Sequence, residues 1–133
     1  MRRLVVRSCV LVLVLAAVAC GSREPLRVTA IQLGRSVNAD STVTDQTTRF
    51  GPHDTVHLAV ITAGAAKGTL SVRWTFGGKI VAEPSKPAPS GDGVATEFSL
   101  QTATGFPPGE YSAEVFLDGH SMGTRTFRIE APR

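Results

Sequence analysis

Histidines and carboxylates are the residues of this chain that could carry acid–base or metal chemistry. His53 and His57 are four residues apart, but they fall across a turn and the start of a predicted strand, so they do not share a helix face. No third ligand for a metal site accompanies them. His120 follows Asp118-Gly119, a dipeptide typical of a β-hairpin turn, and is expected in solvent. The three histidines are therefore predicted to have turn and surface roles.

A loop rich in oxygen-bearing side chains is the remaining candidate for metal binding. Asn38, Asp40 and Asp45 are interleaved with serine and threonine, in the alternating manner of a calcium loop. The loop lacks the central glycine and the bidentate glutamate of an EF-hand. Because the same residue types are ordinary in turns, we expect no metal and no cofactor, and Asn38, Asp40 and Asp45 are only weak candidates for calcium.

Catalytic arrangements are not recognisable in the sequence. It has no Gly-x-Ser-x-Gly motif, no familiar grouping of serine with histidine, and no glycine-rich turn that opens a helix. The carboxylates are dispersed, mostly on predicted outward faces or turns, and include Glu97, Glu110, Glu114 and Asp118. The sequence therefore favours a protein that is not an enzyme, and an enzyme with a site built from loops is the less favoured alternative.

The first 19 residues have the three parts of a secretory signal peptide. Arg2, Arg3 and Arg7 precede an uncharged apolar run at 10–18, which is shorter than the roughly 20 residues that span a bilayer. The run ends in small residues just before Cys20. The sequence Leu-Ala-Ala-Val-Ala-Cys-Gly-Ser at 15–22 resembles the lipobox of bacterial lipoproteins, although alanine stands at 17, where leucine is commonest.

This resemblance implies that the Cys20 thiol receives a diacylglyceryl group, that the chain is cut just before it, and that its new amino terminus is acylated. Residues 20–25 would then be the lipidated cysteine and a short tether. Gly21, where inner-membrane retention uses aspartate, implies delivery to the outer membrane, facing the periplasm, in a Gram-negative host. The alternative is that Cys20 is a small residue beside an ordinary cleavage site.

The cysteine count favours lipid attachment. Cys9 lies in the leader, so Cys20 would be the single thiol of the mature protein and would have no disulfide partner. Each buried methylene contributes about 0.8 kcal/mol, so two or three acyl chains hold a protein on a membrane where one chain does not. The predicted location is the bacterial cell envelope, where a lipid anchor would attach the protein to a membrane.

The net charge of +3 belongs to the leader. Without its three arginines the chain has 11 basic residues against 11 acidic ones, which all lie beyond Cys20. The basic residues are dispersed and not gathered on one face, which argues against nucleic-acid binding.

Period-2 alternation and frequent turns predict an all-β protein after the leader. Gly34 is expected to end the first strand, and 35–48 is expected to be a loop with room for a short strand near Val43. Three prolines and two glycines at 84–93 predict a loop or the cover of a sheet edge. About seven short strands over 26–131 favour a two-sheet antiparallel sandwich, the strands being predicted at 26–33, 55–63, 70–76, 79–83, 94–102, 107–117 and 122–129.

Two aromatic residues resemble landmarks of immunoglobulin-like domains. Trp74 lies in the middle of a strand, as the core tryptophan of that fold does, and Tyr111 follows a Pro-Gly turn, as in a tyrosine corner. The core cysteines of antibody domains are replaced by Ala113 and by Val60 or Ile61. The resemblance is therefore to the broad immunoglobulin-like sandwich of bacterial surface proteins, and it implies a fold without implying an activity.

Phe116 is out of phase with the core face of its strand and is expected on the opposite face. Either a loop or neighbouring side chain covers it, or it belongs to a contact patch for a partner. Taken together, the sequence predicts a membrane-anchored, non-catalytic lipoprotein that acts as a binding or assembly module, with another envelope protein as its partner. A glycan- or calcium-binding envelope module is the alternative.

Overall fold

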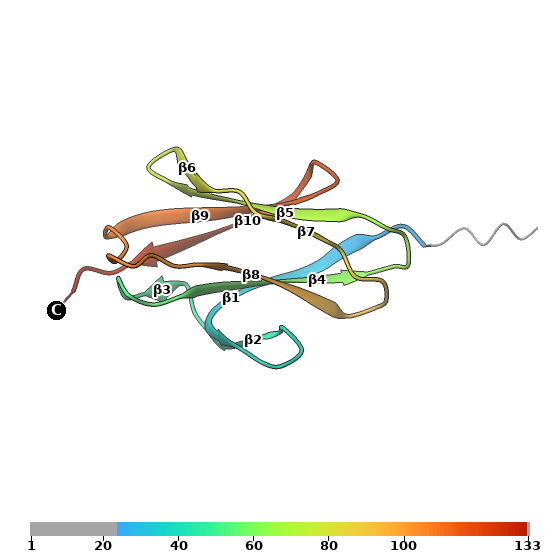
Figure 1. Ribbon diagram of the computed structural model, residues 1–133, viewed down its shortest axis with the longest axis horizontal. Coiled ribbons are helices and arrows are strands. Elements are labelled where there is room, and N and C mark those ends of the chain that lie inside the picture. The colour runs from blue at the N-terminus through green and yellow to red at the C-terminus, as the bar shows by residue number, and fades with distance from the viewer. Residues whose placement is uncertain (1–23, 133) are drawn as a thin grey trace, which may run out of the picture.

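A computed structural model describes residues 24–132 as two β-sheets packed face to face (Figure 1). The two-sheet all-β architecture predicted from the alternation is confirmed. The predicted signal peptide at 1–19 and the lipid-attachment site at Cys20 lie outside the described residues. Between residues 24 and 132 no helix is long and apolar enough to cross a membrane.

The first sheet has the strand order β2-β1-β4-β8 and is antiparallel throughout. Its strands are β1 (Arg27–Val37), β2 (Val43–Gln46), β4 (Val56–Ala63) and β8 (Val94–Leu100). β4 pairs with β1 on one side and β8 on the other, which agrees with the apolar residues on both of its faces.

The second sheet follows the order β3-β10-β9-β5-β6, and β7 pairs with β5 beyond the short β6. Its strands are β3 (Arg49–Phe50), β5 (Thr69–Phe76), β6 (Lys79–Ala82), β7 (Ser85–Pro87), β9 (Gly109–Leu117) and β10 (His120–Ile129). β3 runs parallel to the end of β10, and the other pairs are antiparallel. The predicted hairpin turns at Gly77-Gly78 and Asp118-Gly119 are confirmed, with positive φ at all four residues.

The predicted end of the first strand is wrong. β1 does not stop at Gly34 but continues to Val37. A Cβ atom at Gly34 would lie 2.4 Å from Val43 Cγ1 and 2.6 Å from the Thr44 carbonyl oxygen. This glycine therefore allows β2 to pack closely against β1 and does not end the strand.

The segment 84–93 was predicted to be a loop or to cover a sheet edge, and it covers an edge. β7 extends the edge of the second sheet along β5. Lys86 then reaches the other sheet, where its ammonium group donates to the carbonyl oxygen of Glu97 on β8. The proline-rich segment thus closes one side of the sandwich.

The core lies between the inward faces of both sheets and is aromatic at its centre. Trp74 of β5 has no exposed surface, and its ring meets Phe127 of β10 edge-on at 5.9 Å. Phe127 in turn stacks on Tyr111 at 5.4 Å. Leu58 and Phe98 contribute buried side chains from the first sheet.

The two ends of the sandwich carry different loops (Figure 1). The chain enters β1 at the end that also holds the β4–β5 loop and the β9–β10 turn. The opposite end holds the β5–β6 turn, the loop 101–108 between β8 and β9, and the C-terminus.

Candidate interaction surface

Tyr111 organises the end of the sandwich that lies away from the start of β1. Its side chain is 3% exposed, and its hydroxyl donates a 2.8 Å hydrogen bond to the carbonyl oxygen of Pro107, four residues earlier. This bond closes the turn before β9, which is the geometry of a tyrosine corner. Burial raises the pKa of the Tyr111 phenol above its usual value of 10.0.

Two further aromatic rings surround Tyr111. Phe76, at the end of β5, stacks on it at 4.3 Å, and Phe106 meets it edge-on at 5.8 Å. Gly109 has a φ of 143°, and a Cβ there would lie 3.0 Å from Phe76 Cε2, so a side chain at this position would displace the stack. The loop 101–108 is thus held in place by aromatic packing and one hydrogen bond.

A groove of about 360 Å³ opens beside these rings. Phe76, Val81, Leu100, Phe106 and Pro107 supply its apolar wall, and backbone and hydroxyl groups of the loop 101–108 supply its polar rim. No aspartate, glutamate, lysine, arginine or histidine lines it. The groove is therefore suited to apolar side chains and not to a charged ligand.

The edge strand β6 forms one rim of this groove. Within residues 24–132, β6 pairs with β5 alone, so its other side has unpaired backbone groups. Ile80 is 55% exposed and Val81 is 48% exposed, which makes β6 the most exposed apolar strand of the described chain. An unpaired edge with apolar side chains is a surface to which an extended polypeptide can add as a further strand. We call the groove together with β6 the β6 groove.

Phe116 lies on the outer face of β9, as its phase predicted, and it is half-buried. The Arg73 guanidinium lies 4.8 Å from the centre of its ring, and the Arg73 Nη2 atom lies 2.9 Å from Glu83 Oε1. A neighbouring side chain therefore covers the ring, which was one of the two alternatives. Contact of Phe116 with a partner stays a prediction.

Asn38 and Asp40, two of the weak calcium candidates, have local hydrogen-bond partners. Asp40 accepts bonds from the Thr42 amide at 3.1 Å and the Thr42 hydroxyl at 2.6 Å, and these lower the pKa of its carboxyl below 3.8. The Asn38 amide donates to the same hydroxyl at 2.9 Å. These bonds form the turn between β1 and β2.

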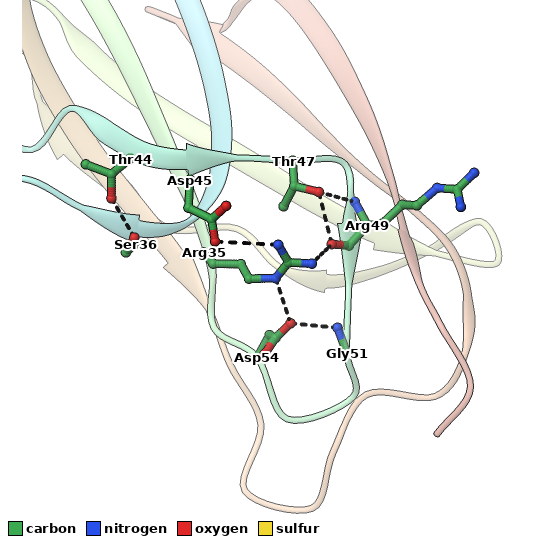
Figure 2. A network of polar contacts seen from close by, with 8 residues as sticks. All are labelled: Arg35, Ser36, Thr44, Asp45, Thr47, Arg49, Gly51 and Asp54. Carbon is green, nitrogen blue, oxygen red and sulfur yellow. Dashed lines mark hydrogen bonds and ion pairs between the residues drawn. The ribbon is translucent and has the colours of Figure 1, made fainter. Parts of the chain in front are cut away.

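Asp45 belongs to a separate polar network, centred on Arg35 (Figure 2). The Arg35 guanidinium lies 3.5 Å from Asp45 Oδ2 and 3.3 Å from Asp54 Oδ2, and it donates to the Arg49 carbonyl at 2.7 Å. Asp54 also accepts the Gly51 amide at 2.7 Å. The network joins β1, β2 and β3 to the turn at 51–54. Over residues 24–132, no three histidine, cysteine, aspartate or glutamate side chains gather as a metal site would require.

His57 lies on the outer face of a strand and not in a turn, and it is more buried than the sequence predicted. It lies half-buried on β4, where its Nδ1 atom is 2.8 Å from Glu97 Oε1 of β8. Ser99 stands opposite His57 in the strand register, but none of the three residues lines the β6 groove. The pair is 40 residues apart in the chain, so no local pattern could have revealed it. His53 is exposed in a turn, and His120 is exposed as the first residue of β10, directly after the Asp118-Gly119 turn.

The comparisons with known proteins bear on the fold. No protein-family model and no curated protein matches the chain. Among solved structures, an immunoglobulin-like protein from Pseudomonas aeruginosa aligns with a TM-score of 0.61 and 13% identity, over 83% of this chain and all of that one. A β-glucosidase from Listeria innocua, in complex with glucose, aligns with a TM-score of 0.51 and 10% identity, and the match covers only 16% of its length. The chain therefore has an immunoglobulin-like β-sandwich fold.

Proposed function

We propose that this protein is a non-catalytic lipoprotein of the bacterial cell envelope, anchored by lipid on Cys20, that binds another envelope protein through the β6 groove. In a Gram-negative host the anchor would be in the outer membrane and the domain would face the periplasm. The role is that of a binding or assembly module.

The observation that carries the proposal is the position and chemistry of the β6 groove. Its lining residues come mainly from the β5–β6 hairpin and the loop 101–108, which lie at the end of the sandwich opposite the start of β1 (Figure 1), so a lipid anchor before β1 would leave the groove accessible. Its lining has no charged side chain, and its rim is an unpaired strand with Ile80 and Val81 exposed. This combination favours an extended segment with apolar side chains as the occupant, because backbone pairing and apolar pockets act together in strand addition.

The anchor is tested by labelling. Cells given a radioactive fatty acid should label the wild-type protein, and Cys20→Ser should abolish the label and release the protein from the membrane fraction. Continued labelling of the Cys20→Ser variant would refute Cys20 as the attachment site.

The groove is tested by photo-crosslinking in living cells. A photoreactive phenylalanine derivative in place of Val81 should form an adduct that mass spectrometry maps to an extended apolar segment of one envelope protein. The matched control is Val37, which is 37% exposed on β1 and should give no such adduct. A synthetic peptide of the mapped segment should bind the purified domain, and Val81→Asp should weaken binding at least tenfold while Val37→Asp does not. Equal adducts at both positions, or none at Val81, would contradict the assignment.

The less favoured alternative, an enzyme with a site built from loops, gains no support from the His57–Glu97 pair, which lies on two strands. In hydrolases that use such a pair, the histidine activates a nucleophile beside an oxyanion-binding site. Ser99 has no hydrogen bond to His57 here, and the pair bridges two strands on the outer face of the first sheet. A structural role for the pair is the simpler account, and His57→Gln should leave partner binding at the β6 groove unchanged.

A further inference from the structure

The first described residues are bonded directly to one end of the sandwich. The carbonyl oxygen of Glu24 accepts hydrogen bonds from the amides of Ala65 and Ala66, both at 3.2 Å. The next residues join the sheet at once, because Arg27 is in register with Ala63 at the end of β4. The chain therefore leaves the domain at the β4–β5 loop.

Close packing holds this entry point. Gly64 has a φ of 109°, and a Cβ there would lie 2.5 Å from the Pro25 carbonyl oxygen. A Cβ at Gly68 would lie 2.9 Å from Leu26 Cδ2, and Leu26 itself packs against the core. The two glycines let the loop pack tightly on residues 25 and 26, so the chain is held against this end of the sandwich before β1 begins.

The tether that remains is very short. Cys20 is four residues before Glu24, and four fully extended residues span at most about 14 Å. The eight residues of β5 carry the chain about 24 Å from this end to the β5–β6 turn. A lipid on Cys20 thus keeps the β4–β5 loop near the bilayer, while the far end is a whole strand length away.

The charges of the segments 64–68, 90–93 and 118–120 come from Lys67, Asp92 and Asp118 and sum to −1, so attraction to anionic headgroups is local to the lysine. The Asp92 and Asp118 carboxylates are turned toward the backbone, where they accept the amides of Gly64 at 3.1 Å and Thr69 at 2.9 Å. Lys67 is exposed and makes no ion pair within residues 24–132. A lysine near an anionic membrane surface is attracted to it.

We propose that the end formed by 64–68, 90–93 and 118–120 rests on the lipid headgroups, so that the domain stands upright and the β6 groove points away from the membrane. This orientation rests on the lipid anchor proposed above. The partner at this end is a lipid surface, and the two ends of the sandwich therefore face different partners.

The experiment uses the lipidated protein in vesicles of phosphatidylethanolamine and phosphatidylglycerol that contain a headgroup-linked nitroxide quencher. Because acylated Cys20 has no free thiol, single cysteine substitutions can be labelled with one fluorophore each. Lys67→Cys and Lys79→Cys are a matched pair, since both lysines are exposed, one in the β4–β5 loop and the other at the start of β6. Ser90→Cys and Thr104→Cys, also exposed, provide a second pair from the same two ends.

Labels at 67 and 90 should be quenched at least fivefold more strongly than labels at 79 and 104. Equal quenching at the two ends would mean that the domain lies on its side, and stronger quenching at 79 and 104 would mean that it is inverted; either result overturns the orientation while leaving the anchor intact. If the labelled protein does not float with vesicles, or if Cys20 itself takes up the fluorophore, the anchor fails and the orientation fails with it. Unquenched labels at all four positions on floating vesicles would show a domain held off the surface and would also refute the proposal.

Discussion

Replacing Trp74 tests whether the core is packed as described. Its side chain is fully buried and meets Phe127 edge-on at 5.9 Å. Truncating a buried tryptophan to alanine typically lowers the free energy of unfolding by about 3–5 kcal/mol, because the side chain's burial energy is lost and a cavity is left behind. We therefore expect Trp74→Ala to lower the free energy of unfolding by about 3–5 kcal/mol.

Trp74→Phe should cost much less, for a reason specific to this structure. The indole Nε1 atom of Trp74 is buried without a hydrogen-bond partner, and such a group costs about 1–3 kcal/mol. Phenylalanine removes that group and keeps most of the apolar volume. The two effects oppose each other, so we expect a net loss below about 2 kcal/mol.

The assay is urea unfolding of residues 20–133 carrying Cys20→Ser, followed by far-ultraviolet circular dichroism. Circular dichroism is needed because Trp74 is the only tryptophan in the chain, so its variants have no indole fluorescence. Phe116→Ala is the control, since this aromatic ring is half-buried on the outer face of the same sheet and should cost about 1 kcal/mol. A loss below 1 kcal/mol for Trp74→Ala, or equal losses for the alanine and phenylalanine variants, would refute the reasoning.

Three further results are expected. Tyr111→Phe should lower the free energy of unfolding by about 1 kcal/mol, because the bond to the Pro107 carbonyl is lost. The same variant should also lose less stability than the wild type at alkaline pH. Burial raises the pKa of Tyr111 above 10.0, so the stabilisation from its protonated phenol is complete below pH 10 and disappears as the pH rises through the pKa of the folded protein. Urea titrations at pH 8 and above compare the two proteins. For Asp40, hydrogen bonds from Thr42 lower the pKa of the carboxyl, so the stabilisation from the ionised carboxylate is present above pH 3.8 and is lost as the pH falls through the pKa of the folded protein. NMR titration of the carboxyl should show this pKa rising in Thr42→Val. An unchanged pKa would mean that the Thr42 hydroxyl does not bond to Asp40 in solution. Arg35→Met should lower the free energy of unfolding by about 1–2 kcal/mol, a figure that allows for solvent screening of ion pairs whose side chains are 37–59% exposed. An unaltered unfolding midpoint would show that the network in Figure 2 does not hold the turn.

Much of the fold was readable from local patterns. β5 alternates between apolar residues that face the core, such as Trp74, and polar residues that face outward. The Gly77-Gly78 and Asp118-Gly119 turns mark two hairpins. The sequence therefore predicted these elements correctly. β3 was not predicted, because two residues are too few to show a period and its pairing with β10 joins distant parts of the chain. Gly34 was misread because a glycine that allows close packing looks the same in sequence as one that ends a strand.

The candidate surface was much harder to predict. Tyr111 was expected to close its turn, but the groove beside it also needs Phe106 from an irregular loop and Val81 from another strand. Alternation within one strand says nothing about which loops meet at the end of a sandwich. The His57–Glu97 pair was missed for the same reason, since it depends on β8 lying beside β4.

The way β1 enters the sheet also determines how the protein would bear load. β1 runs from the end where the described chain begins toward the groove end and pairs antiparallel with β4 from Arg27 opposite Ala63 to Gly34 opposite His57. The hydrogen bonds of such a pair lie perpendicular to the strands. A pull between a lipid at the start of β1 and a partner at the opposite end therefore acts along the strand and shears these bonds together instead of peeling them one at a time. With the anchor and partner proposed above, the sandwich would therefore resist tension between the membrane and the bound protein.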